Sequence, residues 1–145
     1  MYIIIVNATA VANGNPKLVS FTISGKQIGL NEYIRMNRTN KYVGASFKKS
    51  KELEIIGEIN KQVGFIKISE ATEIHYTWFE QNMKRDLDNV AFFKKFINDA
   101  IVKSGLIIND NQKYIKGFRD YFEIDKDNPR VEVEIRIIKN ESISM

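Results

Sequence analysis

Apolar residues alternate with polar ones, or form short runs, in five segments that we expect to be β-strands. Residues 2–6 and 18–23 lie on either side of a turn-rich stretch and predict an opening pair of strands. Residues 72–79 are rich in β-branched and aromatic side chains, with apolar residues at every second position, and predict a central strand. Residues 114–124 and 131–138 are joined by a turn and predict a hairpin.

Two other segments have apolar residues at the three- and four-residue spacing of an amphipathic helix. The first covers residues 46–63, and the second covers about residues 87–103, with Gly105 as its C-terminal stop. Residues 25–40 show neither pattern and predict a loop. The element order predicts a single domain over residues 1–145, of the α/β or α+β class, with a mixed sheet and two main helices on one face. The apolar positions expected to define the buried face of the first helix are Leu53, Ile56, Ile59 and Val63.

Composition is typical of a soluble globular protein. Hydrophobic residues make up 43% of the chain and charged residues 28%, a balance that argues against a disordered or membrane-embedded protein. The absence of cysteine excludes disulfide frameworks, thiolate zinc sites and cysteine nucleophiles, and favours a cytoplasmic protein. The apolar run at residues 2–6 is too short for a membrane span, and no basic residue precedes it as in a signal peptide.

The formal net charge of +4 is unevenly distributed, with the positive excess in the N-terminal part of the chain. Residues 31–51 contain six Lys or Arg residues and one acidic residue, with Tyr and Phe between them. This pattern predicts a surface that binds phosphates, as in a nucleic-acid-binding protein. A solvated loop and helix face without a ligand explains the same composition equally well.

The candidate chemistry lies in residues 84–89, KRDLDN, directly after the predicted central strand. In extended backbone Asp86 and Asp88 point to the same side, so both can reach one cation while Leu87 turns into the core. Mg²⁺ and Mn²⁺ prefer such oxygen ligands and take others from water or a substrate phosphate. A third carboxylate, Asp110, reaches the same site if the chain returns there after the second helix.

Neighbouring residues fit this hypothesis, but ordinary structural roles also explain the motif. Lys84 and Arg85 would offset the repulsion between clustered carboxylates and hold a phosphodiester. Asp88 or Asn89 could instead cap the helix, and residues 109–111 are also good turn formers. Spacing alone therefore favours caps and turns over a metal site.

The motif is part of a longer pattern: RDLDN, an amphipathic helix that contains KK and DA, a glycine, and then ND. These strings stand at residues 85–89, 94–95, 99–100, 105 and 109–110. The segment LNEYIRMNRTNKYVGASFKKSKE, residues 30–52, precedes them and is rich in asparagine and basic residues. Together these strings resemble the RusA-type Holliday junction resolvases, endonucleases found in phages and prophages. The resemblance covers residues 29–138.

The resemblance implies that three aspartates bind a catalytic Mg²⁺. The residues that match them are Asp86, Asp88 and Asp110. Asn109 stands where many relatives have another aspartate, so the third ligand is assigned to Asp110 alone.

The resemblance also implies an active-site lysine on the helix. Lys95 and Lys94 are both candidates for this lysine. More residues lie between the DLDN string and the lysine here than in better-known members, which leaves the register open. At about 100° per residue, Lys95 lies on the side of Asp88 and Lys94 beside the apolar stripe, so we assign Lys95. An i, i+4 surface pair with Asp99 is the alternative role for Lys95.

These observations lead us to expect a Mg²⁺-dependent, or Mn²⁺-dependent, structure-specific endodeoxyribonuclease that resolves four-way DNA junctions in recombination and repair. The resemblance implies a homodimer, and a phage or prophage protein that works in the cytoplasm of a bacterial host. The metal would activate a water, and Lys95 would offset the negative charge that develops on the phosphate. A non-catalytic DNA-binding module and a metal-dependent nucleotide phosphohydrolase are the alternatives. The residues expected to bind DNA are Arg35, Arg38, Lys41, Lys84 and Arg85.

Four residues that resemble functional groups are expected to be structural. His75 and Trp78 lie within the predicted central strand, where packing explains a histidine or tryptophan without catalysis. Asp125 and Asp127 repeat the spacing of the aspartate motif, but they precede Asn-Pro between two strands and predict a turn.

Overall fold

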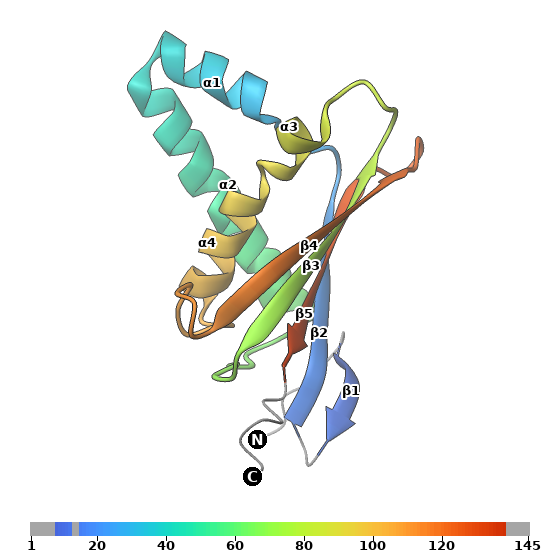
Figure 1. Ribbon diagram of the computed structural model, residues 1–145. Coiled ribbons are helices and arrows are strands. Elements are labelled where there is room, and N and C mark those ends of the chain that lie inside the picture. Colours follow the sequence, from blue (N-terminus) through green and yellow to red (C-terminus); the bar gives the residue numbers. More distant parts are fainter. Residues whose placement is uncertain (1–7, 13–14, 139–145) are drawn as a thin grey trace.

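The computed structural model describes residues 8–12 and 15–138, which form one mixed β-sheet with helices over one face (Figure 1). The α+β class and the mixed sheet are as predicted, and α2 and α4 are the two main helices. The strands are β1 (Ala8–Ala12), β2 (Asn15–Ser24), β3 (Thr72–Glu80), β4 (Ile115–Ile124) and β5 (Arg130–Ile137). The helices are α1 (Leu30–Thr39), α2 (Lys41–Gln62), α3 (Leu87–Ala91) and α4 (Lys94–Ser104).

The order of the strands across the sheet is β1-β2-β5-β3-β4. β3 runs parallel to β4, whereas the other neighbouring pairs are antiparallel. β3 is therefore an interior strand, as predicted, and β4 forms an outer edge. The predicted hairpin of the last two strands is wrong, because β3 lies between β4 and β5 and pairs with both.

The hydrophobic core lies between the sheet and helices α2 and α4. Ile74, Tyr76 and Trp78 of β3 are each at most 2% exposed, which confirms the face predicted from their alternation. Burying each such large side chain contributes about 1.5–3 kcal/mol to folding. Their partners on β5 are equally apolar and are Ile135, Val133 and Val131.

The N-terminal strand pair differs in part from the prediction. Residues 18–23 lie within β2, as expected. The other predicted strand, residues 2–6, lies outside the described residues. Among the described residues, β2 pairs with β1, residues 8–12, in antiparallel orientation.

Residues 30–39 form helix α1, so the predicted loop over residues 25–40 is wrong in its second half. α1 buries none of its residues completely, but Leu30, Tyr33 and Met36 recur at helical spacing and are half-buried, a signal that the prediction of a loop overlooked. Asn40 ends α1 and begins α2, since its Oδ1 accepts a hydrogen bond from the backbone N of Tyr42 at 2.8 Å. α2 consequently starts at Lys41, before the predicted residue 46.

The buried face of α2 is also partly different from the predicted one. Ile59 and Val63 are buried as expected, but Leu53 is 62% exposed, which contradicts its predicted place in the core. Ile55 is buried instead, and so is Glu52 at 4% exposure. α2 faces α4 as well as the sheet, and a charged side chain occupies part of that second contact.

The residues with predicted structural roles have them. His75 is 6% exposed, and its Nε2 lies 2.7 Å from Glu73 Oε1. Asp125 lies in the turn before β5, where its Oδ2 accepts a hydrogen bond from Arg130 Nη1 at 2.8 Å. Across residues 8–12 and 15–138, no helix has the length and apolar character needed to span a bilayer.

Candidate active site

The RDLDN motif lies at the carboxyl end of β3, where the chain leaves the sheet and enters α3. Asp86 is the N-cap residue of α3, in extended backbone at φ −66° and ψ 153°, and Asp88 is in the first helical turn. Both side chains are exposed. Asp86 makes no capping hydrogen bond with its side chain, whereas Asp88 Oδ1 accepts a hydrogen bond from the backbone N of Asn89 at 2.9 Å within the first turn. Two neighbouring carboxylates therefore face solvent at this corner.

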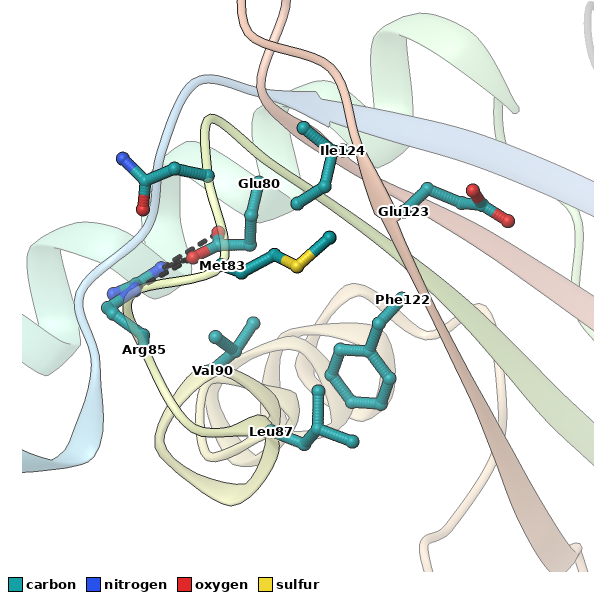
Figure 2. Close-up of a pocket in the computed structure, with 9 residues that line it drawn as sticks. Glu80, Met83, Arg85, Leu87, Val90, Phe122, Glu123 and Ile124 are labelled. Atoms are coloured by element: carbon teal, nitrogen blue, oxygen red, sulfur yellow. Dashed lines mark hydrogen bonds and ion pairs between the residues drawn. The ribbon is translucent and has the colours of Figure 1, made fainter.

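Leu87, which the sequence predicts to turn into the core, is 58% exposed. It lines a pocket of about 280 Å³ between α3 and β4. Figure 2 shows Leu87, Val90 and Phe122 grouped around this space, with Met83 and Ile124 beside them. The prediction fails because β4 is the last strand of the sheet, so the side of α3 that carries Leu87 overhangs an open edge.

The two ends of the motif bind the segment that precedes α1. Arg85 Nε and Nη2 donate hydrogen bonds to both carboxylate oxygens of Glu80 at 2.8 and 2.9 Å (Figure 2). Its Nη1 donates to Gln27 O at 2.9 Å. Asn89 Oδ1 accepts from the backbone N of Asn31 at 3.0 Å. Because the Arg85 side chain is only 13% exposed, its guanidinium holds this corner together.

The helix after the motif is interrupted, whereas the sequence predicts one continuous helix over residues 87–103. α3 ends at Ala91, and α4 begins at Lys94. In between, three backbone amides bond to carbonyls three residues earlier, which tightens the turn and changes the angle between successive side chains. The predicted end of α4 is confirmed, since Gly105 follows it with φ 85°. The three short-range bonds join Phe93 N to Val90 O, Lys95 N to Phe92 O and Phe96 N to Phe93 O.

The two candidate lysines point to different partners. Lys94 Nζ contacts Asp120 Oδ2 of β4 at 2.5 Å. Lys95 is 64% exposed, and its Nζ contacts Asp99 Oδ1 at 3.0 Å, which is the i, i+4 pair considered as its alternative role. Neither lysine has a hydrogen bond or ion pair with the aspartates of the motif among residues 15–138.

Asp110 lies in the exposed loop after α4, at the other end of that helix from the motif (Figure 1). Because β3 and β4 are parallel, α3 and α4 carry the chain from the carboxyl end of β3 back to the amino end of β4. α4 alone spans about 16 Å. Among the residues described, no three His, Cys, Asp or Glu side chains are grouped to hold a metal. One chain therefore brings Asp86 and Asp88 together and leaves Asp110 apart.

The basic residues predicted to bind DNA lie on α1, at the start of α2 and at the aspartate motif itself. Arg35 and Arg38 are exposed on α1, and Lys41 is exposed at the start of α2. Lys84 is exposed directly before the motif. Arg85 differs from these four, since its guanidinium already binds Glu80 and Gln27.

A cluster of charged side chains joins α2 to α4. Lys48 Nζ lies 2.7 Å from Asp99 Oδ2, and Lys103 Nζ lies 2.9 Å from Glu52 Oε1. Burial acts to raise the pKa of Asp99, but hydrogen bonds from Lys48 and Lys95 outweigh it and hold this pKa below 3.8. The carboxylate of Asp99 is therefore more favourable in the folded protein than in the unfolded chain.

Replacing Asp99 with asparagine is expected to lower the free energy of unfolding by about 1–2 kcal/mol at neutral pH. Because the folded-state pKa is below 3.8, this stabilisation is present above that pH and is lost as pH falls through the folded-state value. Urea unfolding at neutral and acid pH measures the difference. Glu54→Gln is the matched control, since Glu54 is 64% exposed in its pair with Lys51. If Asp99→Asn were less stable than the wild type by the same free energy at neutral and at acid pH, the role of the Asp99 charge would be contradicted.

Three structural residues near the motif were not found from the sequence. Asn89 suggested a cap for its own helix, but its partner Asn31 is 58 positions away, which no local pattern shows. Gly29 was also not found, because Asn89, which it lies against, is far from it in the sequence. Asp120 accepts a hydrogen bond from Trp78 Nε1 at 2.8 Å. An acidic residue at a core-facing position of a predicted strand was the signal that could have identified Asp120.

A comparison with models of protein families matches residues 10–136 to the family described as Endodeoxyribonuclease RusA. No curated protein matches the chain. The matched segment contains the aspartate motif, both lysine candidates, Asp110 and the exposed basic residues of α1. Because the match extends over most of the 145 residues, the chain belongs to the endodeoxyribonuclease RusA family.

Proposed function

We propose that this protein is a Mg²⁺-dependent endodeoxyribonuclease that cleaves four-way DNA junctions in recombination and repair in the cytoplasm. The observation that carries the proposal is the pair of exposed carboxylates, Asp86 and Asp88, inside the segment that matches an endodeoxyribonuclease family. Exposed aspartates repel a polyanion unless a cation accompanies them, and the side chain of Asp86 makes no capping hydrogen bond that would explain its place. A divalent ion resolves that conflict.

DNA binding is assigned to the basic arm, which we define as residues 30–41 and which carries Arg35, Arg38 and Lys41. α1 packs mainly against α2 and α3, and its N-terminal end lies beside α3 (Figure 1). The arm therefore starts next to the aspartate motif and extends away from it. Contacts from such side chains go to phosphates and respond to the shape of the DNA more than to base identity.

The separation of Asp110 from the motif supports a homodimer. β4 is the outer strand of the sheet, and its exposed side chains include Phe118, Tyr121 and Ile124. An open edge with apolar side chains is a template for pairing with another strand. We assign this edge to antiparallel pairing with β4 of a second copy.

Antiparallel pairing also explains how the third carboxylate could reach the motif. Asn111 O accepts from Ile115 N at 3.1 Å, so the Asp110 loop lies at the amino end of β4. The pocket beside the motif lies at the carboxyl end of β4, near Ile124. In an antiparallel pair the amino end of one strand lies beside the carboxyl end of the other, which would bring Asp110 of the partner subunit toward Asp86 and Asp88. Such a dimer has two equivalent sites, one for each strand to be cut.

The experiment that tests the proposed function compares substrates and metals. Purified protein is incubated with a labelled four-way junction, the matched linear duplex or a nucleoside triphosphate, with Mg²⁺ or with EDTA. We expect paired symmetrical nicks in the junction with Mg²⁺, little cleavage of the duplex, and none of either with EDTA. Junction binding without cleavage would identify a DNA-binding module, and hydrolysis of the nucleotide alone would identify a phosphohydrolase. Either result would overturn the proposal.

A further inference from the structure

The N-terminus of α1 has no cap of its own. The N-cap residue is Gly29, which has no side chain to accept a hydrogen bond from the first turn. The backbone N of Asn31, the second residue of the helix, donates instead to Asn89 Oδ1 at 3.0 Å. A side-chain oxygen at this position normally comes from the N-cap residue itself. Here the aspartate motif supplies it from a distant part of the sequence.

Space, and not backbone conformation, favours glycine at position 29. Its φ of −92° and ψ of 169° are accessible to any residue. A Cβ atom at this position, however, would lie 2.7 Å from Asn89 Oδ1 and 3.0 Å from Arg85 Nη1. The backbone before α1 therefore approaches both ends of the RDLDN motif so closely that Asn89 or Arg85 would have to move to admit a Cβ atom.

Arg85 strengthens the contact between the motif and the start of α1 from the other end of the motif. Its guanidinium is fixed by two hydrogen bonds to Glu80 and donates a third to Gln27 O at 2.9 Å. Asp86 and Asp88 lie between Arg85 and Asn89 in the sequence. The exposed carboxylates are thus flanked by two residues that both hold the start of the basic arm.

α1 is also held by packing against α2 and by its Tyr33 side chain. It buries none of its residues, and its main aromatic contacts run from Tyr33 to Phe92 and Phe96, with ring centroids 5.3 Å apart in both cases. Tyr33 is the fourth residue of α1, so these contacts hold one side of the first turn, and Asn89 holds the backbone N of Asn31 in the same turn. The hydrogen bond from Asn31 to Asn89 ties this turn directly to the aspartate motif.

We propose that Asn89 is a positioning residue, whose carboxamide caps α1 and so fixes the basic arm relative to Asp86 and Asp88. This inference rests on the proposed function, in which the arm holds DNA and the aspartates act on it. When the cap is lost, the arm keeps its charges and still binds phosphates, but the bound backbone no longer meets the carboxylates in a fixed place. The chemical step suffers while affinity does not, because misplacement by about 1 Å can cost on the order of 100-fold in rate.

The test perturbs the contact between Asn89 and the start of α1 from both sides. Asn89→Ala removes the cap, and Gly29→Ala adds a Cβ atom for which Asn89 or Arg85 would have to move. Asn89→Asp keeps an oxygen that accepts the hydrogen bond of Asn31. Gly57→Ala is the matched control for the glycine change, because Gly57 lies in α2 and a Cβ atom there would meet nothing within 4 Å.

Hydrogen exchange followed by mass spectrometry reports the cap directly. We expect exchange of the α1 amides to rise about five-fold in Asn89→Ala and in Gly29→Ala, as the loss of one N-cap implies. Exchange in β3 and β5 should stay unchanged. Asn89→Asp and Gly57→Ala should both retain the wild-type exchange of α1. Unchanged α1 exchange in Asn89→Ala and Gly29→Ala would overturn the coupling.

Kinetics then separate positioning from a merely structural role. In Asn89→Ala and Gly29→Ala, kcat on the four-way junction should fall at least about ten-fold, while the Kd for the junction in EDTA changes by less than about two-fold. Faster α1 exchange with wild-type kcat would overturn the positioning role. The exchange readout needs no cleavage, so a wild-type protein that does not cut DNA would refute the proposed function without affecting the test of the cap.

Discussion

Replacing Asp88 with asparagine is expected to reduce cleavage of a four-way junction by at least about 100-fold, since it removes a charged ligand from the proposed metal site. Asparagine has the same shape, and its Oδ1 can still accept the hydrogen bond that Asp88 Oδ1 receives from Asn89 N at 2.9 Å. The fold and the basic arm therefore remain intact. Junction binding measured by gel shift in EDTA should match or slightly exceed the wild type, because one negative charge is lost.

The control for this variant is Asp127→Asn, which changes an exposed aspartate in the turn between β4 and β5. Cleavage under single-turnover conditions should be unchanged in the control. Wild-type cleavage by Asp88→Asn would exclude the aspartate motif from the chemistry. Loss of both binding and cleavage would point instead to a folding defect, which circular dichroism of the purified variant detects.

A second large effect is expected from combining two inactive variants in one dimer. If Asp110 of the partner subunit completes each site, a heterodimer of Asp88→Asn with Asp110→Asn has both changes in one site and none in the other. We expect such a heterodimer to cleave at about half the wild-type rate, because one of its two equivalent sites is intact. Its product should be a single nick in place of the paired nicks. Co-expression with two affinity tags isolates the heterodimer for this assay.

A matched pair of variants controls for non-specific rescue. Asp86 and Asp88 lie on the same chain, so a heterodimer of Asp86→Asn with Asp88→Asn has one change in each site and should stay inactive. The absence of rescue in the first heterodimer, with junction binding intact, would show that the three aspartates of a site come from a single chain. It would leave the assignment of the aspartates to be tested by the single variants.

The elements that carry the candidate site were largely predictable, but their arrangement was not. The alternation in residues 72–79 identifies β3 and its buried face, and the motif after it follows directly. Hydrophobic periodicity indicates that a strand exists and not which strand it pairs with or in which direction. β4 is parallel to β3, so Asp110 falls at the opposite end of the helix from Asp86. The error in the predicted hairpin has the same origin.

The assignment of Lys95 shows a different limit. Counting angles along a helix assumes one continuous helix, and the break between Ala91 and Lys94 removes that assumption. The break occurs in a run of aromatic residues, where Phe92 and Phe96 pack around Tyr33 of α1. A contact with a distant helix therefore determines where the nearby lysines point. No pattern in the nearby sequence indicates this contact.

The position of β5 has a consequence for how the protein is made. β5 is the last strand in the sequence, yet it lies between β2 and β3 in the middle of the sheet. The ribosome delivers residues in order, at roughly 5–20 per second in the usual range. Until β5 emerges, β2 and β3 each lack a neighbour and expose apolar surface. The sheet is therefore completed only after residues 130–137 have left the ribosome, and apolar surface stays exposed for longer than in a sheet built from sequential hairpins.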